Sequence, residues 1–270
     1  MGLLPLLRTR VSIALVRATA LEVAVLAAHL VLYPSGVTQE RQAPKPAPTD
    51  AVKLPAQGGP LLPVVMLHGF VDNRSVFVLL RRCLARHGWS HLESLNYSPL
   101  TCDIRTAAEL LGRHVEQICA RTGHQEVDVV GHSLGGLIAR YYVQRLGGDH
   151  RVRTLVTLGT PHAGTRVAPF ASAHPLVRQM RPGSAVIAEL RRPAPDCRTR
   201  FVSFWSDLDQ VMVPPETARL DHPDLAAQNV HVNGIGHLAL PVHPAVATRV
   251  REVLESGGAG LGATGAASVA

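Results

Sequence analysis

Short, continuous runs of apolar residues alternate with longer segments of helical periodicity between residues 63 and 255. Continuous apolar runs predict buried strands, and apolar residues that recur every three or four positions predict amphipathic helices. Strands that are buried on both faces and separated by helices form a mostly parallel sheet. The pattern therefore predicts an α/β fold with a doubly wound, mostly parallel sheet. We expect strands at 63–67, 91–95, 127–130, 154–158, 201–205 and 230–232, and helices at 75–87, 104–121, 134–146, 184–190 and 241–254.

Three further segments flank this region. Residues 1–33 are apolar with arginines near their start, and residues 34–62 contain six prolines and read as an extended linker. Residues 256–270 consist almost entirely of Gly, Ala, Ser, Thr and Val, which predicts a disordered tail. The expected domain is therefore residues 63–255, with a reduced core of about six strands.

Residues 1–33 admit more than one interpretation. The run from Val11 to Leu32 is long enough to cross a bilayer as a helix, although Arg17, Glu22 and His29 oppose insertion. A cleaved signal peptide is less consistent with the sequence, because no small-residue cleavage site follows the apolar run. We favour an uncleaved signal-anchor, which predicts a protein that is membrane-anchored and faces outside the cytoplasm, or is secreted. The alternative is a helix packed on the domain itself.

Composition narrows the function classes. The chain has 270 residues, 46% of them hydrophobic and 17% charged, which fits one globular domain and excludes a disordered acidic chain. The chain has a net charge of +7. Its basic residues are almost all arginines and are scattered along the chain, so we expect no nucleic-acid partner. Four cysteines are too few for a disulfide scaffold and lack zinc-site spacing, although in an exported protein Cys102 could pair with another cysteine.

One motif carries candidate chemistry. Gly131-His132-Ser133-Leu134-Gly135 is a G-x-S-x-G pentapeptide that follows an expected strand and opens an expected helix. This is the context of a nucleophile elbow, in which a serine at a sharp turn exposes its oxygen at the edge of the sheet. Glycines on either side let the strand and helix pass closely. Ser133 is therefore the candidate nucleophile.

With Asp128-Val-Val before it, this motif resembles the α/β-hydrolase superfamily, and in particular bacterial triacylglycerol lipases and related esterases, over residues 63 to about 250. Three more segments carry the resemblance. Residues 65–70 resemble the oxyanion loop of these lipases, 158–165 the loop after the strand beyond the elbow, and 232–237 the catalytic-histidine loop. The resemblance implies that the backbone N–H groups of Phe70 and Leu134 form the oxyanion hole.

Chain order selects among the 14 histidines, because the acid and then the base follow the serine in this fold. His237 lies after the last expected strand on a glycine-flanked loop and is the candidate base, ahead of His231 and His243. The acid is expected after strand 201–205. Asp209 fits the lipase pattern better than Asp207, and the choice stays open between the two.

The expected function is therefore hydrolysis of carboxylic esters through a Ser-His-Asp triad and an acyl-enzyme, with lipid or long-chain acyl esters as substrates. Membrane association through residues 1–33 fits such substrates. A short-chain carboxylesterase, an acyltransferase with the same triad and a non-catalytic membrane-tethered binding protein are the alternatives. No cofactor fingerprint or metal motif is found. About 40 residues separate Leu158 from Phe201, too few for a full cap domain, so we expect at most a partial flap near 167–177.

Overall fold

A computed structural model of the chain describes residues 16–27, 61–70, 72–97, 103–166, 174–257 and 268–269. It contains one sheet in the order β2-β1-β3-β4-β5-β6-β7, in which every neighbouring pair is parallel. The doubly wound α/β prediction is confirmed. The strands are β1 (Val64–Leu67), β2 (Leu92–Leu95), β3 (Val127–His132), β4 (Val152–Leu158), β5 (Arg200–Trp205), β6 (Ala226–Val232) and β7 (Ser268–Val269).

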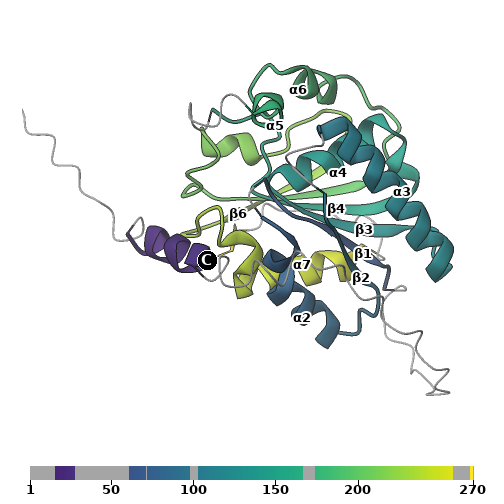
Figure 1. Ribbon diagram of the computed structural model, residues 1–270, viewed down its shortest axis with the longest axis horizontal. Coiled ribbons are helices and arrows are strands. Elements are labelled where there is room, and N and C mark those ends of the chain that lie inside the picture. The colour runs from purple at the N-terminus through teal and green to yellow at the C-terminus, as the bar shows by residue number, and fades with distance from the viewer. Residues whose placement is uncertain are drawn as a thin grey trace, which may run out of the picture.

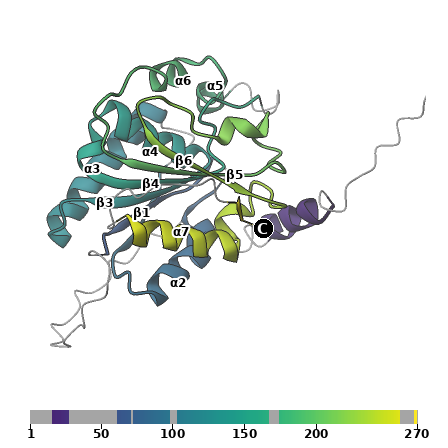
Figure 2. The same ribbon diagram turned by 180° about the vertical axis from the view of Figure 1, so that it is seen from behind.

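Helices cover both faces of this sheet (Figures 1 and 2). One face packs against α3 (Ile104–Thr122), α4 (Leu134–Arg145) and the two short helices α5 (Pro175–Gln179) and α6 (Ala185–Leu190). The other face packs against α2 (Val78–Arg86) and α7 (Pro244–Ser256). Strands β1 and β3 are buried on both faces because a helix layer lies above and below them. This explains why their sequences are nearly continuous apolar runs.

The strand order reverses between β1 and β3. The chain leaves β1 toward β2 at one edge, then returns to β3 on the other side of β1. At such a switch point the loops at the carboxyl ends of the two strands separate and leave a crevice, where α/β proteins bind their ligands. The loop after β1 begins at His68, and the loop after β3 holds Ser133. Topology alone therefore brings these two loops together.

The crossover between β4 and β5 carries two short helices. α5 and α6 span five and six residues, so the part of this crossover that the structure describes contains no full cap domain, as predicted. The helix at 184–190 was expected and α5 was not, because a five-residue helix shows too little periodicity. It begins where the side chain of His174 caps Leu176 N–H and Pro175 occupies the first turn. The expected flap falls largely on 167–173, outside the described residues.

Two terminal segments differ in detail from expectation. α7 continues to Ser256, one residue beyond the predicted domain boundary. Within the segment predicted as a disordered tail, Ser268 and Val269 pair in parallel with His231 and Val232 at the open edge of β6. An edge strand presents unpaired N–H and C=O groups, which any extended segment can satisfy whatever its composition. The linker prediction for 34–62 falls almost wholly outside the described residues.

The helix at residues 16–27 lies against the domain. Ala18 is 2% exposed, and Val25 packs on the core face that α2 and α7 share. None of the described helices is long and apolar enough to cross a membrane. Cys83, Cys119 and Cys197 are free thiols, and Cys102 lies outside the described residues.

Candidate active site

Ser133 occupies the sharp turn between β3 and α4. Its φ of 52° and ψ of −120° make it the single non-glycine residue with positive φ in the described part of the chain. A positive φ is strained for a residue with a Cβ, and the surrounding hydrogen bonds hold it in place. Ser133 N–H donates to Leu158 O at 2.9 Å, and Thr160 Oγ1 donates to Ser133 O at 3.0 Å. The strained backbone of a nucleophile elbow is therefore present where the motif predicts it.

The turn requires the motif glycines because a Cβ at these positions would collide with neighbouring atoms. A Cβ on Gly131 would lie 2.4 Å from Gly136 Cα, and a Cβ on Gly135 would lie 2.3 Å from Leu67 O. Both neighbours are backbone atoms that cannot rotate away. Gly136 is equally confined, since its Cβ would lie 2.0 Å from Thr160 Oγ1. The close approach of α4 to β1 and β3 thus depends on these three glycines.

Asp209 and His237 form a buried pair. His237 Nδ1 lies 2.8 Å from Asp209 Oδ2, and the two residues are 4% and 1% exposed. Asp209 Oδ1 accepts the N–H groups of Val211 and Met212, each at 2.9 Å. The carboxylate is thereby fixed in orientation and directs the imidazole, with Nδ1 toward the acid. Gly159, directly after β4, leaves room for this pair, because a Cβ there would lie 2.9 Å from Asp209 Oδ2.

The competing residues make other contacts. Asp207 is largely exposed, and its Oδ1 lies 3.4 Å from Nε2 of His231, whose ring packs against Trp205. His243 caps the start of α7 by accepting Ala245 N–H. Of the two aspartates left open by the sequence, Asp209 is therefore the one that contacts His237.

The electrostatic surroundings of His237 favour its charged form. Burial lowers the pKa of the imidazole, but the Asp209 carboxylate and its hydrogen bond, then the charges of Asp72 and Glu22, act in the opposite direction. The net result is a pKa raised above the ordinary value of 6.5. A base with a pKa somewhat above its usual value holds a proton more firmly once it has taken it from a nucleophile.

The predicted oxyanion loop lies beside Ser133. A Cβ on Gly69 would lie 3.3 Å from Ser133 Cβ, so the loop after β1 reaches the elbow. His68 supports the loop, since its ring stacks on Tyr97 at 4.5 Å and its carbonyl accepts the Tyr97 hydroxyl at 2.5 Å. Leu134 is the first residue of α4, where a backbone N–H has no acceptor within the helix. Phe70, half-buried, meets the ring of His174 edge-on at 5.0 Å.

His132 has a role that sequence reasoning did not identify. The sequence offered it only as the variable residue of the elbow, yet its side chain is 1% exposed. Its Nδ1 lies 3.0 Å from Asp72 Oδ2, its Nε2 lies 3.2 Å from His237 O, and its ring centroid is 4.8 Å from that of His237. The sequence feature that could have suggested this link is Asp72, a solitary acid just after the oxyanion loop.

His162, in the loop after β4, contacts residues of β4 and α4. Its Nε2 is 2.9 Å from Thr157 Oγ1, and Arg140 donates to its carbonyl at 3.1 Å. Burial and then the charge of Arg140 lower the pKa of His162 well below its usual value. A neutral, fully buried histidine of this kind has a structural role.

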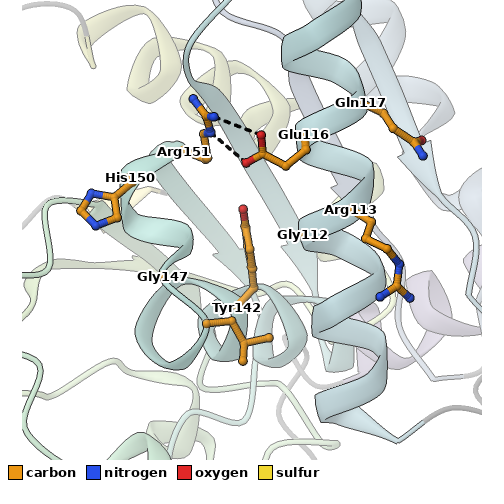
Figure 3. A pocket seen from close by; sticks show the side chains of 9 residues that line it. Gly112, Arg113, Glu116, Gln117, Tyr142, Gly147, His150 and Arg151 are labelled. Atoms are coloured by element: carbon orange, nitrogen blue, oxygen red, sulfur yellow. Dashed lines mark hydrogen bonds and ion pairs between the residues drawn. The ribbon is translucent and has the colours of Figure 1, made fainter.

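A separate cavity of about 670 Å³ lies between α3 and the end of α4 (Figure 3). Arg151 lines it directly before β4, at the amino-terminal edge of the sheet, whereas Ser133 follows β3 at the carboxyl edge. Arg151 is engaged by Glu116, at 2.8 Å and 3.0 Å. This cavity is therefore remote from the candidate chemistry. Among the residues with described positions, no cluster of His, Cys, Asp or Glu is arranged to hold a metal ion.

Comparison with known proteins agrees with this geometry. Residues 63–194 match the family model described as palmitoyl protein thioesterase. Two relatives called triacylglycerol lipase, from Pseudarthrobacter phenanthrenivorans and Burkholderia plantarii, are each 31% identical over 116 residues, 40% of this chain. The matched segment spans 35% and 32% of their lengths, about a third in each case.

The similarity extends further in three dimensions. The mature lipase BlEst2 of Bacillus licheniformis superposes with a TM-score of 0.63 over 76% of this chain and 96% of that one, at 17% identity. At this level of identity the superposition shows the fold. Together with the elbow motif, it shows that this chain has the α/β-hydrolase fold, and over the matched segments the chain is similar to lipases and a thioesterase.

Proposed function

We propose that the chain is a serine ester hydrolase. Ser133 attacks the acyl carbonyl, His237 accepts its proton and returns it to the leaving alcohol, and Asp209 orients the imidazole. Water then attacks the acyl-enzyme with His237 again as base, which releases the carboxylic acid and restores Ser133. The observation that carries this proposal is the buried Asp209–His237 hydrogen bond of 2.8 Å, together with the packing of the His237 ring on His132, the residue directly before a serine held at positive φ.

The backbone N–H groups of Phe70 and Leu134 are the proposed oxyanion donors. They belong to the loop after β1 and the start of α4, the two segments that approach each other at Gly69 and Ser133. Two preorganised donors stabilise the negative charge that develops on the carbonyl oxygen of the tetrahedral intermediate. This arrangement uses protein groups alone.

Lipid or long-chain acyl esters are the proposed substrates, because the named relatives are triacylglycerol lipases. We also propose that the protein acts at a lipid surface outside the cytoplasm, with residues 1–33 mediating membrane association. Helix 16–27 supports this idea, since Val16, Val23 and Leu26 are 54%, 62% and 47% exposed. Sedimentation with anionic phospholipid vesicles, comparing the full chain with Val23→Ser/Leu26→Ser, tests it: equal binding would contradict it.

A second candidate is hydrolysis of long-chain acyl thioesters, which the palmitoyl protein thioesterase match favours. The same triad would perform it, with a thiolate in place of the alkoxide as leaving group. Both candidate functions are tested by measuring hydrolysis of chromogenic esters with acyl chains of two to sixteen carbons and of palmitoyl thioesters, by the parent protein and by Ser133→Ala. Serine-dependent turnover that rises with chain length supports a lipase, and preference for the thioester supports the second candidate. Activity confined to short esters would indicate an esterase.

If neither class is turned over, adding acceptor alcohols distinguishes an acyltransferase from an inactive protein. Labelling of Ser133 by a fluorophosphonate provides a readout that is independent of substrate choice. Absence of both turnover and labelling would overturn the proposed function and leave a non-catalytic binding protein.

A further inference from the structure

Helix 16–27 packs on the domain through one face. Ala18, Glu22 and Val25 lie at positions i, i+4 and i+7, which fall on the same side of a helix. Ala18 is buried, Glu22 is half-buried and Val25 packs against the core. In both views of the fold the helix, coloured purple, lies at the end of the molecule where α7 begins (Figures 1 and 2).

Glu22 makes the polar contacts of this face. Its Oε2 accepts the N–H of Leu238 at 3.0 Å, and its Oε1 accepts the N–H of Ala239 at 2.9 Å. Both donors follow His237 directly in the chain. Hydrogen bonds from backbone N–H to an ionised carboxylate are stronger than those between neutral groups. The carboxylate therefore holds the two peptide units next to the candidate base.

The fit extends to Gly236, on the other side of His237. A Cβ at this position would lie 2.6 Å from Glu22 Cδ and from its Oε1, so the carboxylate occupies the space that a side chain would need. Gly234, two residues earlier, has a φ of 71°, which favours glycine. The turn that carries His237 is thus built of residues with little conformational preference of their own and depends on outside contacts for its shape.

Side chains from two different elements, His132 and Glu22, bind the backbone of this turn. His132 Nε2 lies 3.2 Å from the carbonyl oxygen of His237, and Glu22 binds the two N–H groups that follow. The His237 ring is directed by Asp209 at 2.8 Å. The position and orientation of the imidazole therefore depend on three separate parts of the chain: the end of β3, the loop after β5 and helix 16–27.

We propose that Glu22 is a positioning residue for His237 and that helix 16–27 is part of the active-site structure. The proposal rests on the proposed function, since it assigns His237 the role of base. Glu22 contacts the turn and not the reacting atoms, so it acts through His237. While helix 16–27 is docked, it holds His237 in position to act on Ser133. If the helix undocks, residues 237–239 lose this contact and the reaction slows.

The charges around His237 provide a readout specific to this role. Asp209, Asp72 and Glu22 are the acidic groups that raise the pKa of His237 against the effect of burial, and the ring of His132 is its aromatic neighbour. Removal of one negative charge shifts the pKa of the imidazole downward. A helix that only stabilised the domain would change the melting temperature and leave the titration of His237 unaltered.

Glu22→Gln in the full chain tests the proposal, because glutamine keeps the size of the side chain and loses its charge. We expect kcat to fall about tenfold. This loss is larger than that from one hydrogen bond and smaller than that from displacing a catalytic group by about 1 Å. We also expect the acid limb of kcat/KM to move to lower pH. Glu109→Gln, an exposed acid on α3, is the matched control and should leave both unchanged.

A second measurement does not depend on turnover. NMR titration of the His237 ring, assigned with His237→Gln, should give a lower pKa in Glu22→Gln than in the parent. Amide exchange at Leu238 and Ala239 should be faster in Glu22→Ala. An unchanged titration together with unchanged exchange would overturn the proposal, even for an active enzyme. Altered titration and exchange in a protein that turns over no ester would support the positioning contact and refute only the proposed function.

Discussion

The imidazole of His132 bridges the Asp72 carboxylate and the backbone carbonyl of His237, at 3.0 Å and 3.2 Å. Both partners offer acceptor oxygens, and each ring nitrogen of His132 faces one of them. The residue before the candidate nucleophile is thereby tied to the residue that carries the candidate base. The first prediction concerns this link.

His132→Asn should lower kcat about tenfold while the fold is retained, because the shorter amide cannot span both partners and one of the two buried contacts is lost. Steady-state kinetics on the ester that the parent hydrolyses best checks this, with circular dichroism as the test of folding. His87→Asn, on an exposed residue at the end of α2, is the control. Equal kcat values for the two variants would contradict a role for the bridge.

Asp209→Asn should reduce kcat by about 10³ to 10⁴, since the imidazole loses the carboxylate that fixes its tautomer and stabilises its charge. Asp207→Asn should stay within about twofold of the parent, because this largely exposed residue contacts His231 instead. The comparison resolves the choice that the sequence left open. A larger loss in Asp207→Asn than in Asp209→Asn would reverse the assignment.

The pH dependence follows from the raised pKa of His237. The base must be neutral to accept a proton, so kcat/KM should fall as pH drops through a pKa above 6.5. The sign for stability is opposite: the folded state favours the charged ring, so its contribution is complete below the unfolded pKa of about 6.5 and is lost as pH rises through the folded value. Asp72→Asn should move both transitions to lower pH.

These transitions are measured by pH–rate profiles and by urea unfolding at a series of pH values. His237→Gln provides the control for stability, since it should remove the pH-dependent component in this range. A pH–rate profile that is identical in the parent and Asp72→Asn would show that the acid limb reports another group.

Gly135→Ala should destabilise the fold by about 1–3 kcal/mol or prevent folding, because the added Cβ would lie 2.3 Å from the Leu67 carbonyl oxygen. Gly183→Ala is the matched control. Gly183 has a φ of 77° and nothing within 4 Å, so alanine there bears only the backbone strain of about 1–2 kcal/mol. Urea denaturation should rank Gly135→Ala as the less stable, and the reverse ranking would contradict the tight helix–strand contact.

Arg153→Met should destabilise the domain by about 3–5 kcal/mol, because it leaves the Asp128 carboxylate buried without its cation. Asp128 is 0% exposed, and burial raises its pKa despite the two hydrogen bonds from Arg153. Arg151→Met removes a more exposed pair with Glu116 and should change stability far less, because solvent screens this pair. Similar losses in the two variants would show that Asp128 finds another partner.

The extent to which sequence predicted this molecule depended on the range of the interactions. The central strands and α3, α4 and α6 were predicted within a few residues, because burial imposes a pattern that is visible along the chain. Ser133 was predicted because its strained turn requires local glycines. The start of β6 at Ala226 was missed, since this strand begins with exposed residues that leave no apolar run.

Contacts between distant segments were harder to predict. Asp207 and Asp209 differ by two positions, and only the three-dimensional path of the loop after β5 decides which one reaches His237. Glu22 was recognised as an unfavourable charge in an apolar run, but its partners lie 216 and 217 positions away. No local pattern encodes such a distance, because the domain supplies the complementary N–H groups.

The all-parallel sheet has a kinetic consequence. The candidate site collects its parts from the ends of β1, β3, β5 and β6, and each of these strands reaches its neighbour only after a long crossover. Closing such long loops precedes any gain from the contacts they bring, so this topology folds slowly and forms its most distant pairings at a late stage. Ester turnover recovered during refolding should therefore lag behind the return of helical signal and report completion of the whole sheet.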